Sequence, residues 1–106
     1  MSHTLRQVQE LVAQSTILIS DHGYDELASD DIFVQDVIEG VANAAVIEDY
    51  PDYHKGPCVL VLQFDKLGQP IHVVWGILRE SSHAVVVTGY RPDPQRWTED
   101  FMRRRS

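Results

Sequence analysis

The chain has 106 residues, which is enough for one domain of ordinary size with one hydrophobic core. Hydrophobic residues make up 43% of it and charged residues 24%, a balance typical of globular proteins and not of disordered ones. The formal net charge of -7 disfavours a general nucleic-acid-binding protein, although a local basic patch for RNA is compatible with that charge.

Cys58 is the single cysteine, so an internal disulfide and a multi-cysteine zinc site are excluded. No convincing base lies next to it in the sequence, and we expect it to be buried and inert. No apolar run approaches the roughly 18 residues of a membrane span, and the polar N-terminus has no signal-peptide core. We therefore expect a cytoplasmic protein that contacts no membrane.

The first 40 residues have mostly helical spacing. Apolar side chains from Leu5 to Val12 recur every three or four positions, which predicts a helix with Thr4 as its cap. Residues 17–19 are a short β-like run. Two brief helices should follow: the first capped by Ser20 or Asp21, the second capped by Asp30 or Asp31 and ending at Gly40.

After residue 40 the period changes to that of β-strands. Short turns at residues 66–69 and 80–82 require antiparallel hairpins between the last three strands. Pro92 and Pro94 break the final strand, and Asp93 would cap a terminal helix over Trp97 and Phe101. The strands are expected at residues 45–47, 59–64, 71–78 and 84–90.

Helices followed by an antiparallel meander predict an α+β fold. We expect N-terminal helices packed on a mainly antiparallel sheet of four or five strands, with a short C-terminal helix. No repeat or low-complexity linker divides the chain, so residues 1–106 are expected to form one domain.

Charge is unevenly distributed along the chain. Residues 21–52 hold ten acids and no Lys or Arg, whereas residues 91–106 hold five arginines and three acids. Such a pattern can be a solvated surface with a frayed tail. It can also indicate a basic tail that contacts an acidic partner, a nucleic acid or the acidic half of another copy.

Two histidines are candidates for acid–base chemistry. His22 lies where a strand meets a helix, with Glu26 at helical spacing, so a carboxylate could raise its pKa; capping or packing at the helix start is the alternative. His72 lies within a strand, and alternation places it opposite Trp75. If Trp75 faces the helices, His72 lies on the more open face, where register decides whether Tyr90 joins it in a binding or proton-transfer site or in a structural pair.

Residues 48–57 are predicted to be a shaped polar loop with two prolines and one glycine. His54 with the acids of this loop could bind a divalent cation, but the spacing matches no recognised ligand pattern. The chain has no phosphate loop, dinucleotide fingerprint or nucleophile elbow, and no cofactor is expected.

Several motifs in order resemble the bacterial domain-of-unknown-function family numbered 4258 over roughly residues 15 to 103, and that family has no established biochemical activity. The motifs are Ile19-Ser20-Asp21-His22-Gly23, Ile32 through Asp36-Val37 and Gly40, Ile47-Glu48-Asp49-Tyr50-Pro51, Pro70-Ile71-His72-Val73-Val74, and Thr88-Gly89-Tyr90-Arg91-Pro92-Asp93-Pro94-Gln95-Arg96-Trp97.

The family pattern is similar to RelE-like and BrnT-like toxin folds, which cleave messenger RNA at a sheet face. By position, the resemblance implies catalytic candidates at His22, His72, Tyr90 and Arg91. Arg79, Arg96 and Trp97 are the candidate binding residues. Family members commonly carry arginines where this chain has Glu26 and, approximately, Asp30. Because phosphoryl transfer needs positive charge aimed at the phosphate, these acids disfavour a nuclease.

The leading hypothesis is therefore a toxin-like-fold interaction module without complete catalytic machinery, which binds a protein partner or forms a homodimer. The alternative is a ribonuclease with His22 or His72 as general acid or base and Tyr90 as a proton-transfer or stacking group. Its phosphate contacts would be Arg79, Arg91 and Arg96. A second alternative is a metal or small-ligand binder built on His22, His54 and the acids.

Overall fold

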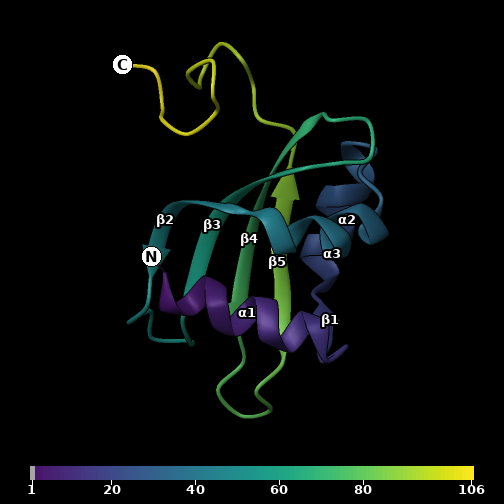
Figure 1. Cartoon of the computed structure of the whole chain (residues 1–106), viewed down its shortest axis with the longest axis vertical. Helices are drawn as coiled ribbons and strands as arrows, with labels where there is room; N and C mark the ends of the chain where they lie inside the picture. The colour runs from purple at the N-terminus through teal and green to yellow at the C-terminus, as the bar shows by residue number, and fades with distance from the viewer. Residues whose placement is uncertain (1) are drawn as a thin grey trace.

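The computed structural model describes residues 2–106, in which three helices pack on one five-stranded sheet (Figure 1). The strand order is β1-β5-β4-β3-β2, with β1 parallel to β5 and every other neighbouring pair antiparallel. The elements in chain order are α1 (His3–Ala13), β1 (Ile17–Ile19), α2 (Asp21–Ser29), α3 (Val34–Gly40), the 3₁₀ turn η1 (Val41–Asn43), β2 (Ala45–Tyr50), β3 (Cys58–Phe64), β4 (Pro70–Ile77) and β5 (Ala84–Tyr90). The α+β prediction is confirmed.

The helices cover one face of the sheet, and α1 crosses the strands on that face (Figure 1). Trp75 points into the core between helices and sheet and is fully buried, so His72, on the other side of β4, lies on the sheet face opposite the helices. No helix within residues 2–106 is long and apolar enough to cross a membrane. The apolar core comprises Leu5, Val8, Leu27, Ile32, Val37, Val41, Val59, Val61, Ile71, Val73, Trp75, Ala84 and Val86.

One buried polar side chain links the sheet to α3. The Gln63 amide donates a hydrogen bond to the Val37 carbonyl (2.8 Å), and its oxygen accepts one from the Trp75 indole N–H (2.7 Å). Gln63 is buried, so these bonds replace the water that both partners would otherwise need. The pair of bonds fixes the orientation of α3 on the sheet.

The helix starts differ in part from the predicted ones. The α1 cap is Ser2, whose hydroxyl accepts the Leu5 N–H (3.0 Å), and not Thr4, which is buried in the first turn. The α2 cap is Ser20, as predicted. Neither Asp30 nor Asp31 caps α3: both precede Phe33, the N-cap residue, and Asp30 instead ends α2.

Two predictions for the second half of the chain are wrong. β2 continues to Tyr50, so residues 48–50 belong to a strand and not to the following loop. Residues 91–106 form turns and not a terminal helix. The chain reverses direction between Thr98 and Arg103, where the Thr98 N–H bonds to the Arg103 carbonyl (2.8 Å). Phe101 lies within this turn and has a positive φ of 60°. This pairing occupies backbone N–H and C=O groups that a helix would need for its own hydrogen bonds.

Replacing Gln63 by Ala is expected to lower the free energy of unfolding by about 2–4 kcal/mol, because it leaves the Trp75 indole N–H and the Val37 carbonyl without partners and opens a cavity. Urea denaturation followed by tryptophan fluorescence measures it. Gln35→Ala, on the exposed face of α3, is the matched control and should change stability by less than about 0.5 kcal/mol. Equal effects of both substitutions would contradict the proposed linking role of Gln63.

Candidate functional site

The C-terminal residues 91–106, here called the C-terminal strap, fold back from the end of β5 toward β2 (Figure 1). The Arg104 guanidinium forms an ion pair with Glu48 on β2 (2.5 Å) and lies 4.9 Å from the centre of the Trp97 ring. The Trp97 ring in turn meets the His72 ring edge-on, with centroids 4.4 Å apart. The strap therefore covers one end of the sheet face opposite the helices.

His72 lies beneath the strap and is 0% exposed. Its Nε2 is 2.8 Å from the Phe101 carbonyl, which can only accept, so Nε2 carries the proton. Its Nδ1, 3.2 Å from the Tyr90 hydroxyl, then accepts from that hydroxyl. Both ring nitrogens are engaged in this neutral tautomer. His72 lies on the sheet face opposite the helices, as expected, but the strap covers this part of the face, so His72 is not open to solvent.

Register brings His72 and Tyr90 together, since the two residues are direct partners across β4 and β5. Burial lowers the pKa of His72, and the nearby Arg104 charge lowers it further, against the opposing effect of the Phe101 carbonyl. Burial also raises the pKa of Tyr90. The pair is consequently a neutral imidazole and a protonated phenol at neutral pH, an arrangement suited to a structural contact.

Glu48 anchors the strap to the edge strand. The Tyr50 hydroxyl donates a hydrogen bond to it, and Arg104 pairs with its other oxygen. These two bonds lower the pKa of Glu48 below its usual range, and the same Tyr50 contact raises the pKa of Tyr50. The carboxylate therefore remains charged, and it holds Arg104 over Trp97.

A basic pocket of about 700 Å³ opens between the strap and the end of β5. Arg96 is 83% exposed there and lies 3.9 Å from Asp93. The Arg105 guanidinium donates to the Pro94 carbonyl (3.0 Å), and within residues 2–106 no carboxylate pairs with it. Guanidinium groups bind carboxylate and phosphate through paired N–H donors. The pocket is lined by Tyr90, Arg91, Asp93, Gln95, Arg96, Trp97, Arg104, Arg105 and Ser106.

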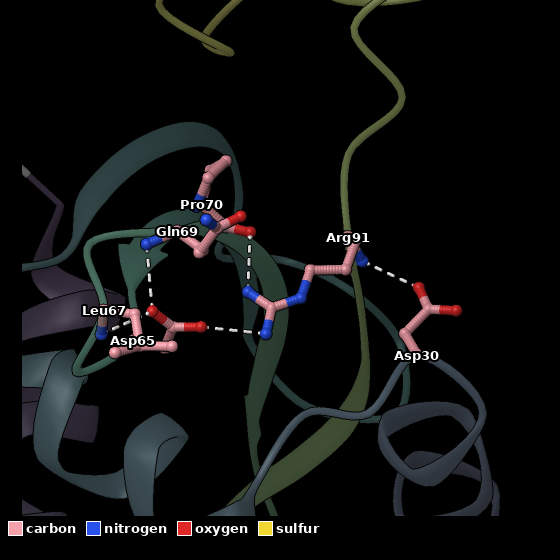
Figure 2. A network of polar contacts seen from close by, with 6 residues as sticks. All are labelled: Asp30, Asp65, Leu67, Gln69, Pro70 and Arg91. Atoms are coloured by element: carbon pink, nitrogen blue, oxygen red, sulfur yellow. Dashed lines mark hydrogen bonds and ion pairs between the residues drawn. The ribbon is translucent and has the colours of Figure 1, made fainter.

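Arg91 joins three segments at one side of this pocket (Figure 2). Its backbone N–H donates to Asp30 at the end of α2 (2.8 Å), and its guanidinium pairs with Asp65 (2.8 Å) and reaches the Pro70 carbonyl (3.3 Å). Asp65 also accepts the N–H groups of Leu67 and Gln69 (2.9 Å each). The predicted phosphate contact at Arg91 is thus already paired with a carboxylate.

The two remaining candidates lie elsewhere. His22 is in the exposed first turn of α2, 3.8 Å from Glu26 as the helical spacing predicts. The Arg79 guanidinium donates to the Tyr53 carbonyl (3.3 Å) beside the loop after β2. Within the described residues, neither His22 nor Arg79 is hydrogen-bonded to His72 or lines the basic pocket.

A family model described as a domain of unknown function (DUF4258) matches residues 19–91. The chain belongs to this family. No curated protein and no solved structure is significantly similar to the chain. The DUF4258 match covers His22, His72, Arg79, Tyr90 and Arg91 but ends where the strap begins. Seven of the nine residues that line the basic pocket therefore lie beyond the matched region.

Sequence reasoning missed the residues of the strap that complete this arrangement in the DUF4258 chain. The sequence predicts a helix at Phe101, whereas this residue contacts His72 through its backbone carbonyl, a group that every residue has and that no sequence pattern reveals. Arg104 and Arg105 were visible as a basic run, but their contacts with Glu48 and Pro94 join distant parts of the chain.

The side chains expected to bind a metal ion or a small ligand do not come together. Within residues 2–106 no three His, Cys, Asp or Glu side chains come together to hold a metal ion, and the His54 ring lies on Tyr53. Cys58 is half-buried, and burial followed by the Asp49 charge raises the pKa of its thiol, which disfavours the reactive thiolate.

Burial of neutral His72 makes the stability of the chain pH-dependent. Its pKa is lower in the folded state, so the stability is full above about pH 6.5 and declines as the pH falls toward the folded-state pKa, because the unfolded chain takes up the proton first. His72→Gln should reduce the loss of unfolding free energy between pH 7 and pH 5.5, whereas the exposed His22→Gln should retain it. Chemical denaturation at both pH values measures this, and an unchanged loss in His72→Gln would disprove the assignment. The groups around His72 are Tyr90, Trp97, Phe101 and Arg104.

Asp65→Asn should lower the unfolding free energy at pH 7 by about 1–3 kcal/mol, because Arg91 loses its ion pair. Burial alone would raise the pKa of Asp65, but its bonds with Gln69, Arg91 and Leu67 lower it. Its stabilising effect is therefore present above about pH 4 and lost as the pH falls through the folded-state pKa. Denaturation at pH 7 and pH 3 compares the variant with Asp52→Asn, which lies in an exposed turn. A similar small loss in both variants would count against the network.

Proposed function

We propose that this chain is a binding module that takes an acidic segment of a protein partner into the basic pocket. The observation that carries the proposal is the convergence of Arg96 and Arg105, beside the Glu48-paired Arg104, around an open pocket in an otherwise acidic protein. Residues 1–90 contain thirteen acids and four bases, whereas residues 91–106 contain three acids and five bases. A carboxylate-bearing partner is attracted to one end of such a molecule.

The geometry of His72 favours binding over catalysis. A general base needs an accessible nitrogen within hydrogen-bond reach of the substrate, and both nitrogens of His72 are occupied beneath the strap. The ribonuclease alternative would require residues 97–105 to leave the sheet. Breaking the Arg104–Glu48 pair and the His72–Phe101 bond would accompany that movement.

A short acidic segment fits the pocket better than an RNA strand does. Single-stranded nucleic acids are bound by exposed aromatic faces that stack on bases, together with an extended basic groove. The Trp97 ring is buried, with Arg104 over one face. The acidic surface of residues 21–52 also repels any polyanion that extends beyond the pocket. These features support a partner whose negative charge is confined to a few residues.

The test is fluorescence anisotropy with a labelled ten-residue Glu- and Asp-rich peptide and, separately, a labelled oligo-uridine, each at 50 and 300 mM NaCl. The variant Arg96→Ala/Arg105→Ala should bind the peptide at least tenfold more weakly than the unsubstituted chain. The control Lys55→Ala/Arg79→Ala removes the same charge away from the pocket and should change the affinity less than twofold.

Equal weakening in both double variants, or no peptide binding at 50 mM NaCl, would refute the pocket as the binding site. Cleavage of the oligo-uridine that disappears in His72→Ala would overturn the proposal in favour of the ribonuclease alternative. Tighter binding of intact oligo-uridine than of the peptide at both salt concentrations would reassign the pocket to RNA.

A further inference from the structure

A second surface, at the junction of α2, α3 and the β3–β4 turn, exposes large apolar side chains. Tyr24 is 59%, Phe33 75% and Leu67 87% exposed. Two adjoining hollows of about 290 and 500 Å³ share Asp31 and Phe33 and connect these side chains. We call this surface the acidic corner; its residues are Tyr24, Asp31, Phe33, Asp36 and Leu67.

Folding does not require apolar side chains at these positions. Phe33 is the N-cap of α3, where Ser, Thr, Asp or Asn would accept a backbone N–H and stabilise the helix by about 1 kcal/mol, and no side-chain cap bond forms there in the described structure. Leu67 lies in a tight turn, in which only its backbone N–H makes a bond, to Asp65. A polar residue would serve the fold better at either position, so the exposed apolar groups need another explanation.

The backbone that carries the acidic corner is held in place by an ion pair and by hydrogen bonds. Arg91 ties Asp65 of the β3–β4 turn to Asp30 of the α2–α3 connection (Figure 2). At the end of α2, the Ile32 N–H bonds to the Leu27 carbonyl (2.9 Å), and the side chains of both residues are buried in the core. The exposed side chains therefore project from a fixed backbone, which reduces the entropy lost when a partner docks.

The charge around the apolar groups is predominantly negative. Asp31 and Asp36 line the larger hollow, and the sequence from residue 21 to residue 52 contributes no base to its surroundings. Lys66 and Arg91 also line it, but the Arg91 charge is neutralised by Asp65 at 2.8 Å. Apolar anchors beside carboxylates are complementary to a segment that combines apolar and cationic side chains.

We propose that the acidic corner docks a basic segment of a protein partner, with apolar side chains seated against Phe33 and Leu67 and Lys or Arg side chains facing Asp31 and Asp36. This surface is separate from the basic pocket and goes beyond the proposed function. A second copy of the chain is a poorer occupant, because its own basic strap is held by the Arg104–Glu48 pair and by backbone pairing. An anionic membrane surface is repelled by the same carboxylates.

The proposal is tested by NMR titration of the isotope-labelled chain with an unlabelled twelve-residue peptide of alternating Leu and Arg, beside a second peptide in which Ser replaces each Leu. The first peptide should shift the amide signals of Tyr24, Phe33 and Leu67, and the second should bind at least fivefold more weakly. Phe33→Ser and Leu67→Ser should each weaken binding of the first peptide at least fivefold. The control Leu78→Ser, at another partly exposed leucine, should change it less than twofold.

Asp31→Asn tests the charge and preserves the backbone, because Asn tolerates the positive φ of 54° at this position. Combined with Asp36→Asn, it should weaken binding and reduce the salt dependence, whereas Asp49→Asn/Asp52→Asn should not.

Signal shifts spread over the whole acidic surface, with no effect of Phe33→Ser or Leu67→Ser, would overturn the proposal. Light scattering that shows a dimer lost in Phe33→Ser would assign the acidic corner to a second copy instead. Neither result depends on Arg96 or Arg105, so failure here is distinguishable from failure of the basic pocket.

Discussion

The ion pair between Arg91 and Asp65 is the contact on which both surfaces depend. Arg91 directly follows the last strand and reaches the β3–β4 turn with its guanidinium and the α2 terminus with its backbone N–H. Asp65 uses one carboxylate oxygen for Arg91 and the other for two backbone N–H groups of its own turn. Because Asp65 and Arg91 also bond to backbone groups, the pair fixes three chain segments relative to one another and leaves little net charge at its centre.

Much of the fold follows from local patterns in the sequence. Three features depend on near neighbours in the chain: the apolar spacing of α1, the short turns between the last strands, and the alternation that places His72 and Trp75 on opposite faces of β4. The His72–Tyr90 pair depends on strand register, which includes an irregularity between Val74 and Trp75 that alternation does not reveal. The sequence therefore does not determine whether Tyr90 lies on the same sheet face as His72 or on the other face.

The C-terminal strap shows why the rest of the site was not predictable. Asp93 followed by Pro94 is a good helix start, and Trp97 and Phe101 have helical spacing, so the local signals favoured a helix. The observed turns are instead held by contacts with residues tens of positions away: Phe101 with His72 and Arg104 with Glu48. Burying one indole and one imidazole outweighed the local preference, and propensities contain no information on such contacts.

The neutral centre at Arg91 also explains how two surfaces of opposite charge coexist on so small a chain. Arg91 lines both the basic pocket and the hollow of the acidic corner, so it marks the boundary between them. With its charge cancelled by Asp65, it extends neither the positive potential of the strap nor the negative potential of the α2–α3 connection. Each surface can therefore attract a partner of its own complementary charge, because the boundary between the two surfaces carries little net charge.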